Sequence, residues 1–355
     1  MAFRHLISIE DVSLPLWEEL YGLCEDIMAC PKNYSLACSG KVLATLFFEP
    51  STRTNFSFQA AMMRLGGSVF GFSEPSATST AKGETFADTV RMMSSYSDAI
   101  VIRSPYEGAA LAASLYSEVP IINAGDGGHL HPTQTLADIT TIRRKRGAIE
   151  KLTVGLCGDL LYGRTIHSLV MALSKFPEIH FYLISPRELA IPDYMLAHLK
   201  RQNQRYIETT NLESVLPQLD ILYMTRVQRE RFEDPSKYDR MKNVYILNRR
   251  KLQAAKEDML VMHPLPRLEE IARDVDDDPR AVYFEQARLG MFIRMALLHK
   301  MTHMPRISAE PLRDNTEGVC VNERCISQKE TYLPKLENPD APGQCAYCDK
   351  NLLTR

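Results

Sequence analysis

From Val42 to about Met301, short runs of apolar, often β-branched residues alternate with longer segments in which apolar residues recur every three or four positions. The short runs are typical of buried strands, and the longer segments of amphipathic helices. The pattern predicts strands over 42–48, 99–103, 119–123, 152–157, 179–184, 220–225, 243–247, 259–262 and 281–284. It predicts helices over 53–65, 85–96, 108–117, 133–146, 164–175, 192–203 and 285–301. Such alternation indicates an α/β protein with parallel sheets covered by helices on both faces.

The chain of 355 residues is long enough for two domains of this kind. The predicted helix over 133–146 ends in four cations and Gly147, as a helix C-terminus should, and a new strand follows it. We therefore place a domain boundary just before this helix, near His131. The prediction is two doubly wound parallel-sheet domains and a small C-terminal module, with these bounds: 1–130 together with 285–303, 131–284, a polar linker over 304–319, and a cysteine-bearing tail over 320–355.

Charge and composition exclude several classes of function. With 42 basic and 44 acidic residues the formal charge is −2, which gives no general attraction to nucleic acid. The first eight residues lack the apolar core of a signal peptide, and no apolar run approaches the ~18 residues of a membrane span. We expect a cytoplasmic protein with neither a membrane nor a nucleic-acid partner.

The junction between the first strand and the first predicted helix has the composition of an anion site. The apolar run 42–48 stops at Pro50, and Ser51, Thr52, Arg53 and Thr54 follow at the start of a helix. A helix N-terminus offers unpaired N–H groups and the positive end of the helix dipole, and hydroxyls and a guanidinium add to both. The alternative is an ordinary capped helix with Arg53 in solvent.

Further polar residues follow other predicted strands, where ligands of parallel α/β sheets bind. Arg103 ends one strand, His131 and Gln134 follow another, and the segment 263–267 (His-Pro-Leu-Pro-Arg) follows a third. Any one of them alone is more easily explained as structural. Their coincidence at strand ends predicts that Arg53, Arg103 and His131 share one site.

The second predicted domain has a similar set. Residues 155–165 connect a strand to a helix and contain Arg164, and Arg226 and Gln228 follow another strand. The glycines of 155–165 do not have the G-x-G-x-x-G spacing, and no suitable acidic residue follows, so NAD binding is the weaker interpretation. Paired arginines suit a substrate with two carboxylates, because a planar guanidinium binds a carboxylate through two hydrogen bonds. For Arg226 alone, an exposed position in a charged loop is a serious alternative.

Six motifs in collinear order resemble the aspartate carbamoyltransferase family over residues 1 to about 303. They are Ser51-Thr52-Arg53-Thr54, Lys82-Gly83-Glu84-Thr85, His131-Pro132-Thr133-Gln134, Gly163-Arg164-Thr165, Arg226-Val227-Gln228 and His263-Pro264-Leu265-Pro266. The resemblance implies the carbamoyltransferase fold and a homotrimer or a multiple of trimers. It also implies transfer of the carbamoyl group of carbamoyl phosphate to L-aspartate, the committed step of pyrimidine biosynthesis, without a catalytic cofactor.

The resemblance also implies residue roles. Ser51, Thr52, Arg53, Thr54 and the helix N-terminus would bind the phosphate, and Arg103, His131 and Thr54 the carbonyl oxygen. Gln134 and the backbone carbonyls of Leu265 and Pro266 would accept hydrogen bonds from the carbamoyl NH₂, and Arg164, Arg226 and Gln228 would bind aspartate. Lys82 and a loop hydroxyl, Ser79 or Thr80, would enter the site of the adjacent subunit, where Lys82 also contacts aspartate.

Two rival functions remain open at this point. Ornithine carbamoyltransferases resemble one another in a His-Cys-Leu-Pro turn, whereas position 264 here is proline, and Arg226 would repel an ammonium group. A catalytically silent assembly subunit is the second rival, although such a copy usually loses at least one of the residues named above.

Four of the eight cysteines lie in the tail as two close pairs, Cys320 with Cys325 and Cys345 with Cys348. Two close pairs supply the corners of a tetrahedral zinc site, and a tail this short has too little core to fold alone. Disulfides and unliganded thiols are the alternatives. The tail resembles, with a shorter gap between the pairs, the zinc domain of the regulatory chain that accompanies some aspartate carbamoyltransferases. This resemblance implies a contact between subunits, and it leaves a separate regulatory chain open.

Overall fold

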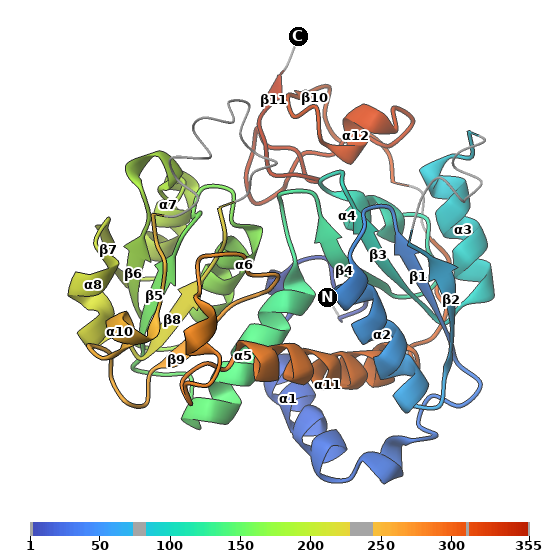
Figure 1. Ribbon diagram of the computed structural model, residues 1–355. Coiled ribbons are helices and arrows are strands. Elements are labelled where there is room, and N and C mark those ends of the chain that lie inside the picture. Colours follow the sequence, from blue (N-terminus) through green and yellow to red (C-terminus); the bar gives the residue numbers. More distant parts are fainter. Residues whose placement is uncertain (1–2, 74–82, 228–243, 310–311, 354–355) are drawn as a thin grey trace. The chain divides into compact units, whose positions relative to one another are not determined.

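The computed structural model describes residues 3–73, 83–227, 244–309 and 312–353 (Figure 1). The chain forms two compact units. Unit 1 comprises Met1–Thr133 and Met291–Arg355, and unit 2 comprises Gln134–Gly290. The bounds of these units differ by a few residues from those of the two α/β domains predicted from the sequence. The predicted linker and cysteine-bearing tail are part of unit 1. Two helices, α5 (Pro132–Arg146) and α11 (Tyr283–Met301), run through the divisions.

Unit 1 contains a parallel sheet of four strands in the order β2-β1-β3-β4. Its strands are β1 (Val42–Phe47), β2 (Ser68–Phe72), β3 (Ala99–Ser104) and β4 (Ile121–Asp126), and its helices before α5 are α1 (Leu14–Ala29), α2 (Thr52–Arg64), α3 (Phe86–Tyr96) and α4 (Ala109–Ser114). The central strands β1 and β3 are almost entirely buried, as their continuous apolar runs predict. Since the chain goes from β1 to β2 on one side and then returns to β3 on the other, the strand order reverses between β1 and β3. This reversal is a topological switch point, where α/β sheets bind ligands.

Unit 2 contains a parallel sheet of five strands in the order β7-β6-β5-β8-β9. Its strands are β5 (Thr153–Cys157), β6 (His180–Ile184), β7 (Arg205–Thr209), β8 (Ile221–Met224) and β9 (Leu260–Met262), and its helices are α6 (Arg164–Leu173), α7 (Asp193–Arg201), α8 (Leu212–Val215) and α10 (Arg249–Leu252). Here the strand order reverses between β5 and β8.

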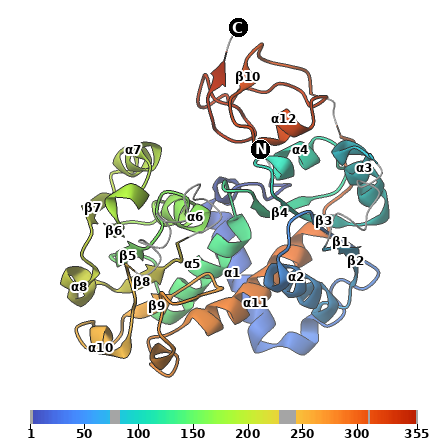
Figure 2. The ribbon, with the colours of Figure 1, turned by 45° about the horizontal axis from the view of Figure 1, so that its top comes forward.

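The tail folds around its cysteines with little regular structure. It contains a two-residue antiparallel pair, β10 (Val319–Cys320) and β11 (Leu352–Leu353), and a short helix, α12 (Ile326–Lys329). Figures 1 and 2 both place α12 beside α4. The buried tail cysteines and Tyr347 form one apolar cluster with residues of β1, β3 and α4.

Two predicted strands are wrong. Of 243–247, residue 243 lies outside the described residues, and only Leu247 pairs, in an isolated bridge with Ile271. Of 281–284, only Ala281 pairs, with Val261, because α11 begins two residues later. The predictions also missed α1 and the edge strands β2 and β7, whose partly exposed residues lack a continuous apolar run.

No helix in the described parts of the chain combines the length and the apolar character that crossing a bilayer demands.

Candidate functional site

The junction of β1 and α2 leaves a helix N-terminus without a side-chain cap. Ser51 occupies the N-cap position, but its hydroxyl makes no capping hydrogen bond. The first bond of the helix runs from the Asn55 N–H to the Ser51 carbonyl oxygen at 3.0 Å, so the N–H groups of Thr52, Arg53 and Thr54 precede the helical ladder. Because serine normally caps such a helix, an uncapped N-terminus with three N–H groups is suited to an external anion.

Arg103 lies at the carboxyl end of the neighbouring strand. Arg103 in β3 pairs with Phe47 in β1, and the Arg103 carbonyl oxygen accepts a hydrogen bond from the Phe48 N–H at 2.8 Å. The sheet register therefore places Arg103 beside the segment that leads into α2. Its guanidinium is buried. One amino group donates to the Ala124 carbonyl oxygen at 3.2 Å, and the other lies 3.5 Å from Glu49 Oε1.

The surroundings of this guanidinium are suited to binding an anion. Arg103 is 8% exposed, and within the described residues its Nε has no hydrogen-bond partner. Burial lowers the pKa of Arg103; Glu49 opposes this shift, and the positive charge of Arg53 adds to it. Two cations that repel each other near an unused buried donor would be stabilised by a bound anion. Arg53 and Arg103 therefore lie close enough for their charges to interact.

His131 follows β4 in the same unit, directly before α5. It is buried, and its Nδ1 lies 3.4 Å from the Thr133 hydroxyl. The carbonyl oxygen of Ala124, on the same strand, accepts the hydrogen bond from Arg103.

In unit 2, two candidate arginines follow the strands on either side of the switch point. Arg164 is the first residue of α6, and Arg226 follows β8 after Thr225. Gly158, which follows β5, allows the two strand ends to approach: its φ is +123°, and a Cβ there would lie 2.3 Å from the Thr225 carbonyl oxygen. Glycine is therefore required at this position.

The turn after β9 is fixed by His263. The Leu265 N–H donates to His263 Nδ1 at 2.8 Å, so Nδ1 carries no proton, and Nε2 donates to Glu270 Oε1 at 2.8 Å. Burial lowers the pKa of His263 despite the opposing effect of Glu270. His263 thus holds the backbone turn that contains Leu265 and Pro266, whose carbonyl oxygens are predicted acceptors of the site.

Four residues named from the sequence, Ser79, Thr80, Lys82 and Gln228, lie outside the described residues.

Two acidic residues near the candidates were not among the residues predicted from the sequence. Glu49, which faces Arg103, lies two residues before the first motif and four residues before Arg53. Asp138 accepts a hydrogen bond from Gln134 Nε2 at 2.7 Å. The spacing of four residues on α5 was an available signal, because such residues are neighbours on one helix face.

The four tail cysteines form a compact, buried cluster, with all four Sγ atoms within 4.8 Å of one another. Cys320 and Cys348 are 3.4 Å apart and Cys325 and Cys345 3.9 Å apart, sulfur to sulfur. Thiolates on a tetrahedral zinc would be separated by about 3.8 Å, given Zn–S bonds near 2.3 Å. The donor set and its spacing therefore fit a closed, four-thiolate metal site.

The tail docks on the loops that follow β3 and β4. The Glu107 N–H donates to the Arg324 carbonyl oxygen and the Ile326 N–H to the Glu107 carbonyl oxygen, both at 2.9 Å. Asn322 Nδ2 donates to the buried Glu107 carboxylate at 2.8 Å.

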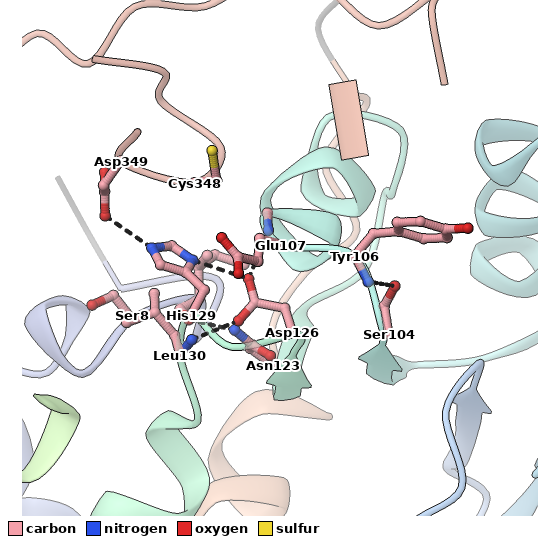
Figure 3. Close-up of polar contacts among 12 residues, drawn as sticks. Ser8, Ser104, Tyr106, Glu107, Asn123, Asp126, His129, Leu130, Cys348 and Asp349 are labelled. Carbon is pink, nitrogen blue, oxygen red and sulfur yellow. Dashed lines mark hydrogen bonds and ion pairs between the residues drawn. The ribbon is translucent and has the colours of Figure 1, made fainter. Parts of the chain in front are cut away.

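A second contact runs through His129, which lies between Asp126 and the tail residue Asp349 (Figure 3). The distances are 3.2 Å from Nδ1 to Asp126 and 2.9 Å from Nε2 to Asp349. Burial lowers the pKa of His129, but the two carboxylates outweigh it and raise the pKa well above its ordinary value. The tail thus contacts the loop after Arg103 and the loop that leads to His131.

Two family models match consecutive parts of the chain. "Aspartate/ornithine carbamoyltransferase, carbamoyl-P binding domain" matches residues 4–144, and "Aspartate/ornithine carbamoyltransferase, Asp/Orn binding domain" matches residues 150–301. Among similar proteins, the aspartate carbamoyltransferase catalytic subunit of Clostridium novyi is 57% identical over 298 residues, which cover 84% of this chain and 97% of that protein. The chain belongs to the aspartate carbamoyltransferase family.

Solved structures of this family agree with the fold. Aspartate transcarbamoylase from Trypanosoma cruzi, in complex with carbamoyl aspartate and phosphate, is 39% identical and has a TM-score of 0.80, covering 84% of this chain and 96% of that one. The catalytic subunit of the M. jannaschii enzyme is 45% identical with a TM-score of 0.78, covering 84% and 97%. Both family models end at or before residue 301, so the cysteine-bearing tail lies outside them.

Proposed function

We propose that this protein is an aspartate carbamoyltransferase, which transfers the carbamoyl group of carbamoyl phosphate to the amino group of L-aspartate and releases phosphate. The observation that carries the proposal is the buried Arg103 guanidinium, whose Nε has no hydrogen-bond partner in the described parts of the chain. It lies close to Arg53 and the uncapped N-terminus of α2. Similar proteins support it, since one T. cruzi structure contains carbamoyl phosphate and aspartate and another contains N-(phosphonacetyl)-L-aspartic acid.

In the proposed mechanism, Ser51, Thr52, Arg53, Thr54 and the N–H groups of α2 bind the phosphate. Arg103, His131 and Thr54 donate to the carbonyl oxygen, while Gln134 and the carbonyls of Leu265 and Pro266 accept from the NH₂ group. The amine of aspartate attacks the carbonyl carbon, a C–N bond forms, and the C–O bond to phosphate breaks. The leaving phosphate takes up the proton that the amine loses. Negative charge grows on the carbonyl oxygen, so donors already in place lower the barrier, and phosphate leaves readily.

Aspartate fits the second unit better than ornithine does. Arg164 and Arg226 offer two cations to two carboxylates, and the same cations would repel the ammonium group of ornithine. In this proposal Gln228 completes the aspartate site, and Lys82 with Ser79 or Thr80 reaches it from a neighbouring subunit of a trimer.

We also propose that Cys320, Cys325, Cys345 and Cys348 hold a structural zinc ion. Four thiolates close the coordination sphere, so the metal would stabilise the tail without binding substrate. The proposed location of the protein is the cytoplasm, where thiols remain reduced.

The experiment is a product assay with purified full-length protein, carbamoyl phosphate and either L-aspartate or L-ornithine. Carbamoyl-aspartate should form, at a higher kcat/KM than citrulline from ornithine. Faster turnover of ornithine would reverse the acceptor assignment. No product above the blank with either amino acid would favour a silent assembly subunit.

A further inference from the structure

A buried carboxylate on α5 connects several segments of unit 2. Asp138 is fully buried and accepts three hydrogen bonds: from Gln134 Nε2 at 2.7 Å, from Gln286 Nε2 at 2.6 Å and from the Tyr223 hydroxyl at 2.9 Å. We call these four residues the Asp138 network. These three donors are uncharged, and each of their hydrogen bonds to the carboxylate has a defined direction.

Each donor belongs to a segment that the proposed function uses. Gln286 accepts the His263 N–H at 3.0 Å through its other amide atom, Oε1, and His263 in turn holds the turn with Leu265 and Pro266. Tyr223 lies in β8, shortly before Arg226, and interacts with the hydroxyl of Thr165, the neighbour of Arg164. Gln134 is the third donor and is the residue proposed to bind the carbamoyl NH₂ group.

The chemistry of Asp138 decides which way the amide of Gln134 faces. An ionised carboxylate only accepts hydrogen bonds, so the atom of Gln134 that contacts it must be the nitrogen. The oxygen of the same amide then lies on the other branch, facing away from Asp138. An amide without such a partner could present either its oxygen or its nitrogen to a ligand, and only the oxygen can pair with an NH₂ group.

We propose that Asp138 is a positioning residue that fixes the Gln134 amide with its oxygen toward the substrate and so makes the site selective for a carbamoyl group. This inference rests on the proposed function. A substrate analogue with a methyl group in place of NH₂ has no donor there and gains nothing from the oriented oxygen. The loss of an oriented acceptor should therefore weaken binding of carbamoyl phosphate and leave acetyl phosphate unaffected.

Asp138→Leu is the informative variant, because leucine has a similar size but offers no acceptor. Asparagine would not serve, since its oxygen could take the place of Oδ1 and still accept from both Gln134 and Gln286. Without an acceptor at position 138, the Gln134 amide can turn either its oxygen or its nitrogen toward the substrate. The comparison is the KM for carbamoyl phosphate against the inhibition constant of acetyl phosphate in the same assay. We expect the preference for carbamoyl phosphate to fall about tenfold, the loss associated with one hydrogen bond.

Two further variants calibrate this result. Tyr223→Phe removes a different hydrogen bond to the same carboxylate, so it should lower the thermal unfolding midpoint without changing the preference between the two ligands. Gln134→Leu removes the acceptor itself and should lower the preference at least as much as Asp138→Leu. If Asp138→Leu does not fold, Asp138→Ser, which leaves room for water beside Gln134, is compared in the same way.

The outcomes separate the two proposals. If the wild-type protein forms no carbamoyl-aspartate, the proposed function fails and the inference fails with it. If the wild-type protein is active, but Asp138→Leu (or Asp138→Ser) weakens binding of carbamoyl phosphate and acetyl phosphate equally, the function stands and Asp138 has a structural role alone. A selective loss of carbamoyl phosphate supports the inference.

Discussion

At the scale of single residues, Arg103 shows how a sheet determines the chemistry of a side chain. Strand pairing buries its guanidinium, Ala124 and Glu49 fix its two amino groups, and Nε remains without a partner among the described residues. A solvent-exposed arginine would have little preference for one position. The orientation imposed on Arg103 is what suits it to a charge that develops at a defined place in the transition state.

Replacing Arg103 should therefore affect the reaction more than the fold. We expect Arg103→Ala to lower kcat/KM for carbamoyl phosphate by roughly 10²–10³. Arg103→Lys keeps the charge but loses the planar fork, so it should recover only part of the loss. Steady-state kinetics at varied carbamoyl phosphate would measure both variants. Full recovery in the lysine variant would show that charge alone, without orientation, accounts for the effect.

At the scale of elements, the two sheets place their candidate residues by the same rule. In unit 1 the order reverses between β1 and β3, which precede and carry Arg53 and Arg103. In unit 2 it reverses between β5 and β8, which precede Arg164 and Arg226. Connections at a switch point diverge from each other and leave the strand ends accessible. This geometry explains why each pair of arginines has an equivalent topological position.

The docking of the tail depends on a close approach at Gly108. Its φ is +81°, and a Cβ there would lie 2.4 Å from the Tyr347 carbonyl oxygen. Gly147 has a similar φ of +77° but nothing within 4 Å, so it is a matched control. Both alanine variants should cost about 1 kcal/mol of stability through backbone strain. Gly108→Ala alone should also speed hydrogen exchange at the Glu107 and Ile326 amides. Equal exchange in the two variants would contradict this close docking.

The tail should also depend on its metal. Wild-type protein should contain about one zinc ion per chain, and Cys345→Ser should lose most of it, because one of four thiolates is removed. Cys30→Ser is the control: Cys30 is exposed and lies outside the cluster, so zinc content should not change. Metal analysis of the purified proteins would measure this. Less than half an equivalent of zinc in the wild type would argue against the four-cysteine site.

At the scale of the whole molecule, the proposed active site needs residues from two chains. We expect Arg53→Ala and Lys82→Ala each to be nearly inactive. After dissociation and reassembly of a mixture, activity should reappear, because a cyclic trimer with both variants contains one site with native Arg53 and a native Lys82 from its neighbour. The product assay, with each variant reassembled alone as the control, would detect this. A mixture as inactive as its components would indicate that each chain builds its own site.

The sequence alone predicted the two α/β domains, the strand-end positions of Arg53 and Arg103, and the grouping of the four tail cysteines in one cluster. These follow from local periodicity, from helix N-terminal chemistry and from spacing, each of which involves residues near one another in the chain. The strands β2 and β7 were missed, because edge strands lack the continuous apolar run that indicates a buried strand.

Only the tertiary structure decided which polar groups face one another. Asp138 meets Gln286 across 148 residues and Tyr223 across 85, and Asn322 meets Glu107 across 215. Packing of whole elements sets these pairs, and no local pattern encodes them. Burial then makes these hydrogen bonds necessary, because a polar group removed from water must find a partner of complementary chemistry.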